Sequence, residues 1–594
     1  MDAWPGCGSA ERALREGQKM RKILKYFGPY KWPVIITVLL TAVQSLSQLY
    51  LPSLMSDIVD KGIVGKNISL IIETGLIMLG FSLIVTVCTV LARYYSAKVA
   101  SGFSRDLRKD IFSKVSNYSL NEFDKIGTAS LITRSTNDVT QIQNAVTMIL
   151  FMLLAAPIMA VGGVIMAINE DPGLSWLIVA AIAFVSLIVL FVAIKALPLF
   201  KSLQKKIDKV NLVLRENLTG IRVIRAFNKT GFEKKRFDVV NKDLTDTSIT
   251  VHRWMGALMP GILIALNLAT VAVIWFGGLR VDAGEIQVGD LIAFQQYVMQ
   301  IMFAVIMATM MFVMLPRASA SAERINEILD MKTTVVDEAK TMPQTVLRGH
   351  VEFKDVSFYY QGAKEPVLSH ISFESRPGQV TAIIGGTGSG KSTLIKLIPR
   401  FYDVSEGQVL VDGVDVREYP KAALRQKIGF VPQKASLVSG TIADNLRFGR
   451  PDATEEDLQK AIEIAQADEF ISTLEGGISA EVAQDGMNFS GGQKQRLSIA
   501  RALVRRPEVY IFDDSFSALD FKTDAKLRQA LSSEVKDASV LIVAQRVNTV
   551  MTADNILVID EGRIVGQGTH RELIQSCETY REIVESQLSM EELA

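Results

Sequence analysis

The sequence is poor in features that mark several classes of protein. Among 594 residues it has only three cysteines, Cys7, Cys88 and Cys577, and their wide spacing excludes a disulfide framework and a cysteine metal site. The formal net charge is +1, so the overall charge gives no reason to expect a nucleic-acid partner. The first residues, MDAWPGCGSAERALREGQ, lack the apolar core of a signal peptide, so none is expected.

Charged residues are also missing from six long runs, all before Arg317. Each run is close to, or longer than, the roughly 20 residues that a helix needs to cross hydrocarbon. The runs lie between charged residues at 31–57, 73–93, 138–170, 171–195, 253–280 and 290–317. Buried helices of a soluble protein are the alternative, which six such runs in one half of the chain disfavour. We therefore expect six membrane spans followed by a soluble half.

The charge of the loops predicts the orientation of the spans. The segments after the second and fourth spans are rich in lysine and arginine, whereas the other loops are short and poor in both. By the positive-inside rule, the two long loops and both termini are cytoplasmic. The long loops have helical periodicity, so we expect the spans to continue into the cytoplasm and turn there. Residues 117–126, around Phe123, and 219–227 are candidate contacts with the C-terminal half; solvated helices are the alternative.

The pattern changes near Gly349, where short β-branched runs alternate with helical patterns, as in an α/β domain. The motif GGTGSGKST lies between the strand VTAII and the helix STLIKLIPRF and matches G-x-x-x-x-G-K-[ST]. In such a P-loop, backbone amides and a helix N-terminus hold phosphates, the lysine reaches the outer phosphates and the serine binds Mg²⁺. The predicted ATP-binding residues, with Ser392 also a Mg²⁺ ligand, are Gly385, Gly386, Thr387, Gly388, Ser389, Gly390, Lys391, Ser392 and Thr393.

Two further motifs follow the P-loop. The apolar run VYIF ends in Asp513, which is placed to help hold Mg²⁺ as a Walker B carboxylate. In NFSGGQKQRLSIARAL, two glycines open a basic helix and make a second anion-binding N-terminus. This motif resembles the signature of ATP-binding cassette (ABC) proteins, and its nucleotide-binding residues are Ser490, Gly491, Gly492 and Gln493. Together with six spans and two long loops, the motifs resemble the half-transporter ABC exporters over about residues 20–585.

The resemblance implies further roles and a fold. Tyr360, with Tyr359 as the alternative, is similar to the aromatic residue that stacks on adenine, and Gln433 to the glutamine that contacts Mg²⁺ and the attacking water. SALD at 517–520 resembles the D-loop between two nucleotide sites.

The implied fold is a membrane α-helical domain, with six transmembrane helices and long cytoplasmic extensions, followed by an α/β P-loop ABC ATPase domain. The expected parts are a tail and interfacial helix at 1–30, a transmembrane domain at 31–318, a linker at 319–348, a nucleotide-binding domain at 349–585 and a tail at 586–594.

The catalytic centre departs from the family pattern at two positions. The residue after the Walker B aspartate is normally glutamate, the general base for the attacking water, but here it is Asp514, one methylene shorter. A base displaced on this scale can lose on the order of 100-fold in rate. Where the family has a switch histidine, this chain has Gln545, whose amide can donate hydrogen bonds but cannot take up or release a proton at neutral pH. We therefore expect a site with catalytic residues Asp514, Gln545 and Gln433 that binds ATP and Mg²⁺ but hydrolyses ATP poorly.

An intact signature beside a weakened catalytic centre predicts a heterodimer. In the family, each nucleotide lies between the P-loop of one chain and the signature of the other. The signature of this chain would therefore complete the site of a second half-transporter that carries the consensus glutamate and histidine. Two alternatives remain open: a homodimeric exporter, and a regulatory membrane protein in which ATP gates with little pumping. An importer fits the fused layout less well.

The substrate and the location follow from weaker signals. Methionines gather on one broad face of the sixth span, at Met299, Met302, Met307, Met310, Met311 and Met314. Such faces suit adaptable apolar ligands, although helix packing explains them equally well. The spans hold no acidic residue that would face a cationic ligand. We expect ATP-driven export of a small amphipathic or hydrophobic molecule, drug or lipid-like, by a multi-pass protein of the bacterial plasma membrane.

Overall fold

The computed structural model describes residues 25–337, 343, 345, 347–534 and 537–587. The chain divides into two compact units. One, the membrane unit, joins the chain up to Lys114 with Ala129–Asp330; the other, the α/β unit, joins Val115–Thr128 with the chain from Met331 onward. The segment Val115–Thr128 therefore lies between two membrane helices in the sequence but folds with the C-terminal half.

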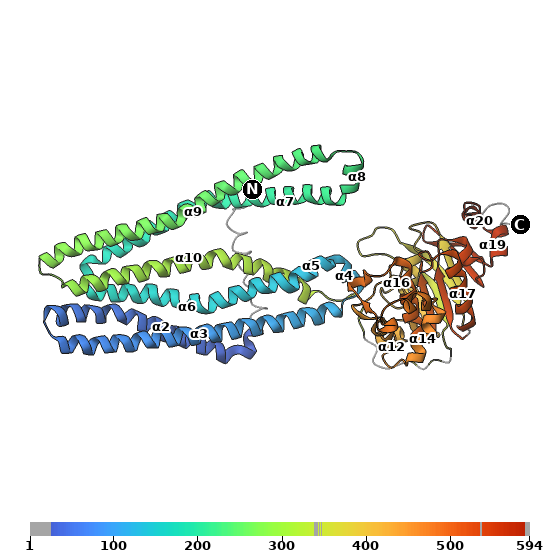
Figure 1. The fold of residues 1–594 in the computed structure, drawn as a ribbon, viewed down its shortest axis with the longest axis horizontal. Coiled ribbons are helices and arrows are strands. Elements are labelled where there is room, and N and C mark those ends of the chain that lie inside the picture. Colours follow the sequence, from blue (N-terminus) through green and yellow to red (C-terminus); the bar gives the residue numbers. More distant parts are fainter. Residues whose placement is uncertain (1–24, 338–342, 344, 346, 535–536, 588–594) are drawn as a thin grey trace, which may run out of the picture. The chain divides into compact units, whose positions relative to one another are not determined.

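Within the described residues, six helices of the membrane unit are long and apolar enough to cross a bilayer, which confirms the six expected spans. They are part of α2 (Lys31–Asp57), α3 (Ile68–Ser116), α6 (Val139–Glu170), α7 (Ser175–Thr219), α9 (Thr230–Asp282) and α10 (Val288–Asp330). Helix α3 has 49 residues, so at 1.5 Å per residue it is about 73 Å long, more than twice the ~30 Å of a hydrocarbon core. Helix α3, like the long helices α7, α9 and α10, is therefore longer than the hydrocarbon core requires, as the periodicity of the long loops predicts; Figure 1 shows these long helices.

Short helices precede the first span or connect one span with the next. They are η1 (Lys25–Tyr30), η2 (Ile58–Val64), α4 (Leu120–Ile126), α5 (Thr128–Thr133), η3 (Arg134–Asp138), η4 (Pro172–Leu174) and α8 (Ile221–Ala226). Of the expected tail and interfacial helix at 1–30, the part before Lys25 lies outside the described residues. The candidate contact segment 117–126 contains α4, in the α/β unit. The other, 219–227, contains α8, which joins the neighbouring helices α7 and α9 (Figure 1) and is followed by the exposed Phe227.

Small residues let α2, α6 and α10 approach closely. A Cβ at Gly162 would lie 2.4 Å from Leu49 Cδ1, and a Cβ at Gly163 would lie 2.8 Å from Ile301 Cγ1. Tyr297 is fully buried, and its hydroxyl donates a hydrogen bond to the Leu49 carbonyl at 3.0 Å. Within a membrane, such close packing and interhelical hydrogen bonds hold helices together. These three helices therefore form the packed core of the membrane unit.

Helix α10 continues to Asp330 and does not end near residue 318. The sequence after 318, SASAERINEILD, is rich in residues of good helix propensity. Its apolar side chains Ala322 and Ile325 are buried, so packing also supports the helical conformation. The first part of the segment expected as a linker, 319–330, is therefore helical, and the chain leaves α10 only at Asp330.

Among the described residues, the α/β unit contains two main sheets, and its mixture of strands and helices agrees with the α/β domain that the sequence pattern predicts. The larger has the order β12-β11-β3-β10-β9-β6, with β12 antiparallel to its neighbour and the other five strands parallel. Its strands are β3 (Val380–Gly385), β6 (Ile428–Val431), β9 (Val509–Asp513), β10 (Ser539–Val543), β11 (Asn555–Asp560) and β12 (Arg563–Gly568). The antiparallel sheet β2-β1-β4-β5 and the pair β7-β8 comprise β1 (Val351–Phe358), β2 (Leu368–Ser375), β4 (Glu406–Val411), β5 (Val414–Asp415), β7 (Gly440–Thr441) and β8 (Glu481–Val482).

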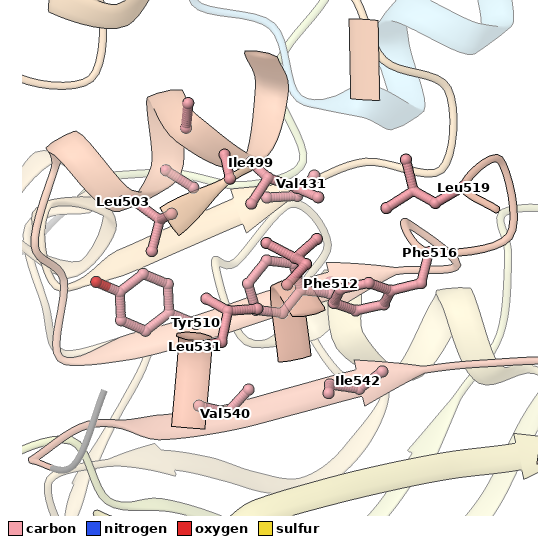
Figure 2. Close-up of a cluster of buried hydrophobic side chains, with 14 of the residues drawn as sticks. Val431, Ile499, Leu503, Tyr510, Phe512, Phe516, Leu519, Leu531, Val540 and Ile542 are labelled. Carbon is pink, nitrogen blue, oxygen red and sulfur yellow. The ribbon is translucent and has the colours of Figure 1, made fainter. Parts of the chain in front are cut away.

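The α/β unit also contains helices, several of which pack on the larger sheet. They are α11 (Lys391–Leu397), α12 (Lys421–Gln426), α13 (Ile442–Arg447), α14 (Glu455–Ile464), α15 (Asp468–Ser472), α16 (Gly491–Val504), α17 (Phe521–Glu534), α18 (Val547–Val550), α19 (His570–Ser576) and α20 (Glu578–Glu585). Strand β9 is buried at every residue, as expected for a central parallel strand. Tyr510 and Phe512 face one cluster, shown in Figure 2 with Ile499 and Leu503 of α16, whereas Ile511 faces another. Packing on both faces therefore fixes the end of β9.

Candidate active site

Four neighbouring parallel strands bring the predicted site residues to one edge of the sheet. Strands β3, β10, β9 and β6 lie side by side in that order. The P-loop follows β3, Gln545 follows β10, Asp513 ends β9 and Gln433 follows β6. Because the carboxyl ends of parallel strands meet at the same edge, this order gathers groups that are far apart in the sequence.

The P-loop is a tight turn between β3 and α11. A Cβ at Gly385 would lie 2.0 Å from the Ile559 carbonyl oxygen, so only glycine fits against β11. Gly390, at the start of α11, has a φ of +100°, a conformation that glycine adopts without strain. Lys391 Nζ donates to the carbonyls of Gly385 and Gly386 at 2.9 and 2.6 Å, and burial lowers the pKa of Lys391. The lysine ammonium is thus held over the loop.

Ser392 and Asp513 form a pair of oxygen ligands. Ser392 Oγ donates to Asp513 Oδ1 at 2.7 Å. Asp513 is buried, and burial raises its pKa. A serine hydroxyl at the start of a P-loop helix, beside a carboxylate that ends a strand, is the protein donor set that P-loop enzymes offer to Mg²⁺. The residues present therefore fit a Mg²⁺ ion that accompanies a nucleotide.

The carboxylate of Asp514 contacts both of the predicted site glutamines, Gln433 and Gln545. Its Oδ2 accepts hydrogen bonds from Gln545 Nε2 at 2.9 Å and from Gln433 Nε2 at 3.3 Å. The backbone φ of Asp514 is +48°, a left-handed conformation that aspartate tolerates better than most residues. Asp514 is buried, and burial raises its pKa. The three residues therefore form one hydrogen-bonded group with a single ionisable member.

Of the two candidate aromatic residues, Tyr360 is the one beside the P-loop. Its hydroxyl lies 3.0 Å from Thr393 Oγ1, in the helix that the P-loop opens. Its ring packs edge-on against Phe358 and Tyr402, at centroid distances of 5.0 and 5.5 Å. Tyr359, in contrast, is 39% exposed. Contact with the P-loop helix thus distinguishes two neighbours that the sequence alone leaves equivalent.

The signature motif opens helix α16, as its sequence predicts. Ser490 caps the helix: its backbone N–H donates to Gln493 Oε1 at 2.8 Å, and its Oγ accepts from Gln493 N at 3.3 Å. A Cβ at Gly492 would lie 3.2 Å from the Ala518 carbonyl, in the D-loop segment. Among the described residues, no hydrogen bond joins the signature to the P-loop. The structure therefore gathers the P-loop, Asp513, Asp514, Gln433 and Gln545, and places the signature apart from that group.

Arg546 is a residue of this region that the sequence motifs do not indicate. Its guanidinium donates to the carbonyls of Ser517 at 3.0 Å and Leu519 at 3.4 Å. It therefore ties the segment that carries Gln545 to the D-loop segment. Its position directly after Gln545 is the only sequence signal that could have drawn attention to it.

Comparison with known proteins identifies the family. Residues 34–305 match the family model described as ABC transporter transmembrane region, and residues 368–517 match the model described as ABC transporter. A Mycobacterium tuberculosis protein named as an uncharacterized ABC transporter ATP-binding protein is 44% identical over 95% of this chain and 97% of its own length. This chain belongs to the ABC transporters. A Mycobacterium bovis relative, named fatty acid ABC transporter ATP-binding/permease protein, is 33% identical over 79% of this chain and 74% of its own length.

A solved structure agrees in fold with this ABC transporter. The structure of a bacterial Atm1-family ABC exporter with ATP bound aligns with a TM-score of 0.76 and 24% identity, covering 94% of this chain and 97% of the other. At that identity the likeness concerns the fold. The chain is thus a half-transporter with a membrane region and an ATPase domain fused in one polypeptide. It is a multi-pass membrane protein of exporter fold whose α/β unit binds ATP.

Proposed function

We propose that this chain is the subunit with the weaker nucleotide site in a heterodimeric ABC exporter. The P-loop and Tyr360 hold ATP, and Ser392, Asp513 and Gln433 hold Mg²⁺, which neutralises charge on the phosphates. Hydrolysis takes place mainly at a second site, which Ser490–Gln493 of this chain complete on the partner's nucleotide. The partner half-transporter supplies the consensus glutamate and histidine to that second site.

The observation that carries this proposal is the hydrogen bonding of Asp514. Gln545 and Gln433 each donate an amide N–H to its Oδ2. A general base has to reach the attacking water and take its proton. Here the acid is one methylene shorter than the family's glutamate. It also accepts hydrogen bonds from two neutral amides, which cannot take up a proton at neutral pH. Such a group suits retention of nucleotide better than rapid hydrolysis.

The preserved signature supports the assignment of a partner. The N-terminus of α16 begins at Gly491, and among the described residues nothing lies within 4 Å of a Cβ built there. Open N–H groups at a helix N-terminus attract anions such as phosphates. In a chain with a weakened catalytic centre, an accessible signature has a function if that signature completes the nucleotide site of another subunit.

The proposed substrate is a small amphipathic or hydrophobic molecule, drug or lipid-like. Helix α10 offers Phe303 and Met310, which are 56% and 49% exposed and lie seven residues apart, on one helical face. Met302, in contrast, is fully buried in helix packing. The relative named as a fatty acid transporter supports a lipid-like substrate. In this proposal both termini lie in the cytoplasm of a bacterial cell, and α4 and α8 carry movement from the ATPase domains to the spans.

The subunit composition of the complex tests the proposal. The chain is tagged in its native host, purified in mild detergent and analysed by native mass spectrometry. One copy of this chain beside a different ABC half-transporter supports the heterodimer, and ATPase activity is then expected to vanish when the partner's glutamate is replaced. Two copies of this chain alone would contradict the heterodimer and leave Asp514 and Gln545 in both sites.

A further inference from the structure

Glu122, in helix α4, is a buried carboxylate that joins two distant segments. It is 4% exposed. Its Oε2 accepts hydrogen bonds from Ser119 N at 2.8 Å, Ser119 Oγ at 2.7 Å and Thr333 Oγ1 at 3.1 Å, and its Oε1 accepts one from Thr334 N at 2.9 Å. Burial opposes the charged form, but the hydrogen bonds from Ser119 and Thr334 outweigh it, so the pKa of Glu122 lies below its ordinary value. The carboxylate therefore ties α4 to the segment that follows α10.

Helix capping accounts for only half of this arrangement. Ser119 and Glu122 form a capping box at the start of α4. Thr569 and Glu572 form the same box at the start of α19, where Glu572 is exposed. Capping therefore requires neither burial nor the additional bonds from Thr333 and Thr334. Because burying a carboxylate is costly unless it is fully hydrogen-bonded, those additional bonds point to a second role for Glu122.

The two segments that Glu122 joins are each fixed to the core of the α/β unit. On α4, Leu120 packs against the core, and Asp124 Oδ2 accepts a long hydrogen bond from the buried Tyr402 hydroxyl at 3.4 Å. After α10, Arg400 Nη2 donates to the Val336 carbonyl at 3.1 Å. The loop between α3 and α6 and the exit of α10 are thus held to the same domain, and Glu122 holds them to each other.

The same two stretches of chain are also paired inside the membrane unit. In η3, the buried Asp138 accepts hydrogen bonds from Ser321 Oγ at 3.0 Å and Arg324 Nε at 2.7 Å, both on α10. Arg134 Nη1 donates to Glu327 Oε2 at 2.6 Å. Separation of a hydrogen-bonded ion pair with a buried partner is strongly unfavourable, because it leaves that charge uncompensated. Each unit therefore has its own link between the loop and α10.

We propose that Glu122 is a positioning residue that makes the loop between α3 and α6 and the exit of α10 move as one body when this chain binds ATP. The inference rests on the function proposed above, in which nucleotide binding at this chain moves the spans. Without the bonds from Thr333 and Thr334 to Glu122, the two stretches keep only the weaker neutral contacts of Ser119 Oγ and Asn121 Nδ2 with Thr334 Oγ1, at 3.0 and 3.2 Å, and their separate contacts with the core. With them, η3 and α10 receive the same displacement, and the pairing of Asp138 with Arg324 stays intact through the movement.

Hydrogen exchange measured by mass spectrometry on the purified complex tests this role, with MgATP as the probe. In the unmodified protein, MgATP is expected to slow exchange in the P-loop, in η3 and in residues 321–327 of α10. In Glu122→Gln, the response of the P-loop is expected to remain, while that of η3 and α10 falls by roughly tenfold, the scale of one hydrogen bond to a charged group. The matched control Glu572→Gln, which alters the same capping bond in α19, is expected to keep all three responses.

A covalent substitute for the carboxylate separates positioning from folding. Ser119 Oγ and Thr334 Oγ1 lie 3.0 Å apart, so cysteines at both positions bring two sulfur atoms within reach of a disulfide. The three native cysteines are first replaced by alanine. In the Glu122→Gln background, the oxidised S119C/T334C protein is expected to regain the response of η3 and α10, and reduction is expected to remove it again.

Two results would overturn the proposal. One is a Glu122→Gln protein in which α10 responds to MgATP as fully as before. The other is loss of the α10 response when S119C and T334C are oxidised with Glu122 intact, because the two segments would then have to separate. Failure of the proposed function shows elsewhere, in the subunit composition and in the response of the P-loop itself.

Discussion

Lengthening the side chain at position 514 tests whether reach limits catalysis at this site. Asp514 Oδ2 lies 2.9 Å from Gln545 Nε2 and 3.3 Å from Gln433 Nε2. A glutamate would carry its carboxylate about 1.5 Å further, toward the space that these amides occupy. Asp514→Glu alone is therefore expected to raise ATP turnover less than about tenfold, because the longer acid meets the Gln545 amide before it is free to orient water.

The double variant Asp514→Glu/Gln545→His removes both obstacles. It supplies a base of the family's length and an imidazole that can exchange a proton near neutral pH. Misplacement of a catalytic group by about 1 Å can cost on the order of 100-fold, so correcting it is expected to raise turnover by about 100-fold. The assay is phosphate release by the purified complex; in the proposed heterodimer, the partner's catalytic glutamate is replaced to silence the other site.

Asp355→Glu is the matched control for this prediction. Asp355 also has a left-handed backbone, with φ +49° against +48° for Asp514, but it lies on an exposed part of the α/β unit. The control is expected to leave turnover unchanged, which separates reach from the backbone effect of the substitution. If the double variant still binds nucleotide but turns over no faster than the unmodified chain, reach does not limit this site and the reasoning fails.

Three further predictions follow from the geometry. Lys391→Ala removes a buried ammonium beside the P-loop carbonyls and is expected to weaken nucleotide binding by about 10- to 100-fold, the scale of lost charged hydrogen bonds, measured with a fluorescent ATP analogue. Gly163→Val places atoms where Ile301 now lies and is expected to destabilise the membrane unit by about 1–3 kcal/mol, seen as a lower Tm in detergent. The pKa of Glu122 in the folded protein lies below the ordinary glutamate value of 4.5, so its stabilisation is present above pH 4.5 and is lost as the pH falls through the folded pKa. The difference in unfolding free energy between Glu122→Gln and the unmodified protein should therefore shrink on acidification below pH 4.5.

Motifs that are local in the sequence predicted most of the site. Lys391 and Ser392 lie within one strand–loop–helix unit, and Asp513 follows a fully apolar strand, so each is recognisable without knowledge of its neighbours. Their juxtaposition is different, because it depends on β10 lying between β3 and β9. That strand order is not a local property of the sequence, and the contact of Gln545 with Asp514 emerges only from it.

Glu122 shows why other features escape sequence reasoning. The pattern Ser119-x-x-Glu122 predicts a capping box, which the structure contains. The bond from Thr334, however, spans 212 residues of sequence, and no pattern in either segment indicates it. The end of α10 was hard to predict for a related reason: the charge-free run ends at Arg317, but buried Ala322 and Ile325 carry the helix onward to Asp330.

The inclusion of residues 115–128 in the α/β unit has a consequence for biosynthesis. Thr334 and Tyr402, which contact α4, leave the ribosome 212 and 278 residues after the residues they bind. At roughly 5–20 residues per second, α4 spends at least about ten seconds with Leu120 and Glu122 uncovered. An α/β unit translated alone from Met331 would lack part of its own fold. The α/β unit can therefore complete its fold only after the segment that contains α4 has been synthesised with the membrane helices. A chaperone that shields α4 in the interval would raise the yield of folded protein.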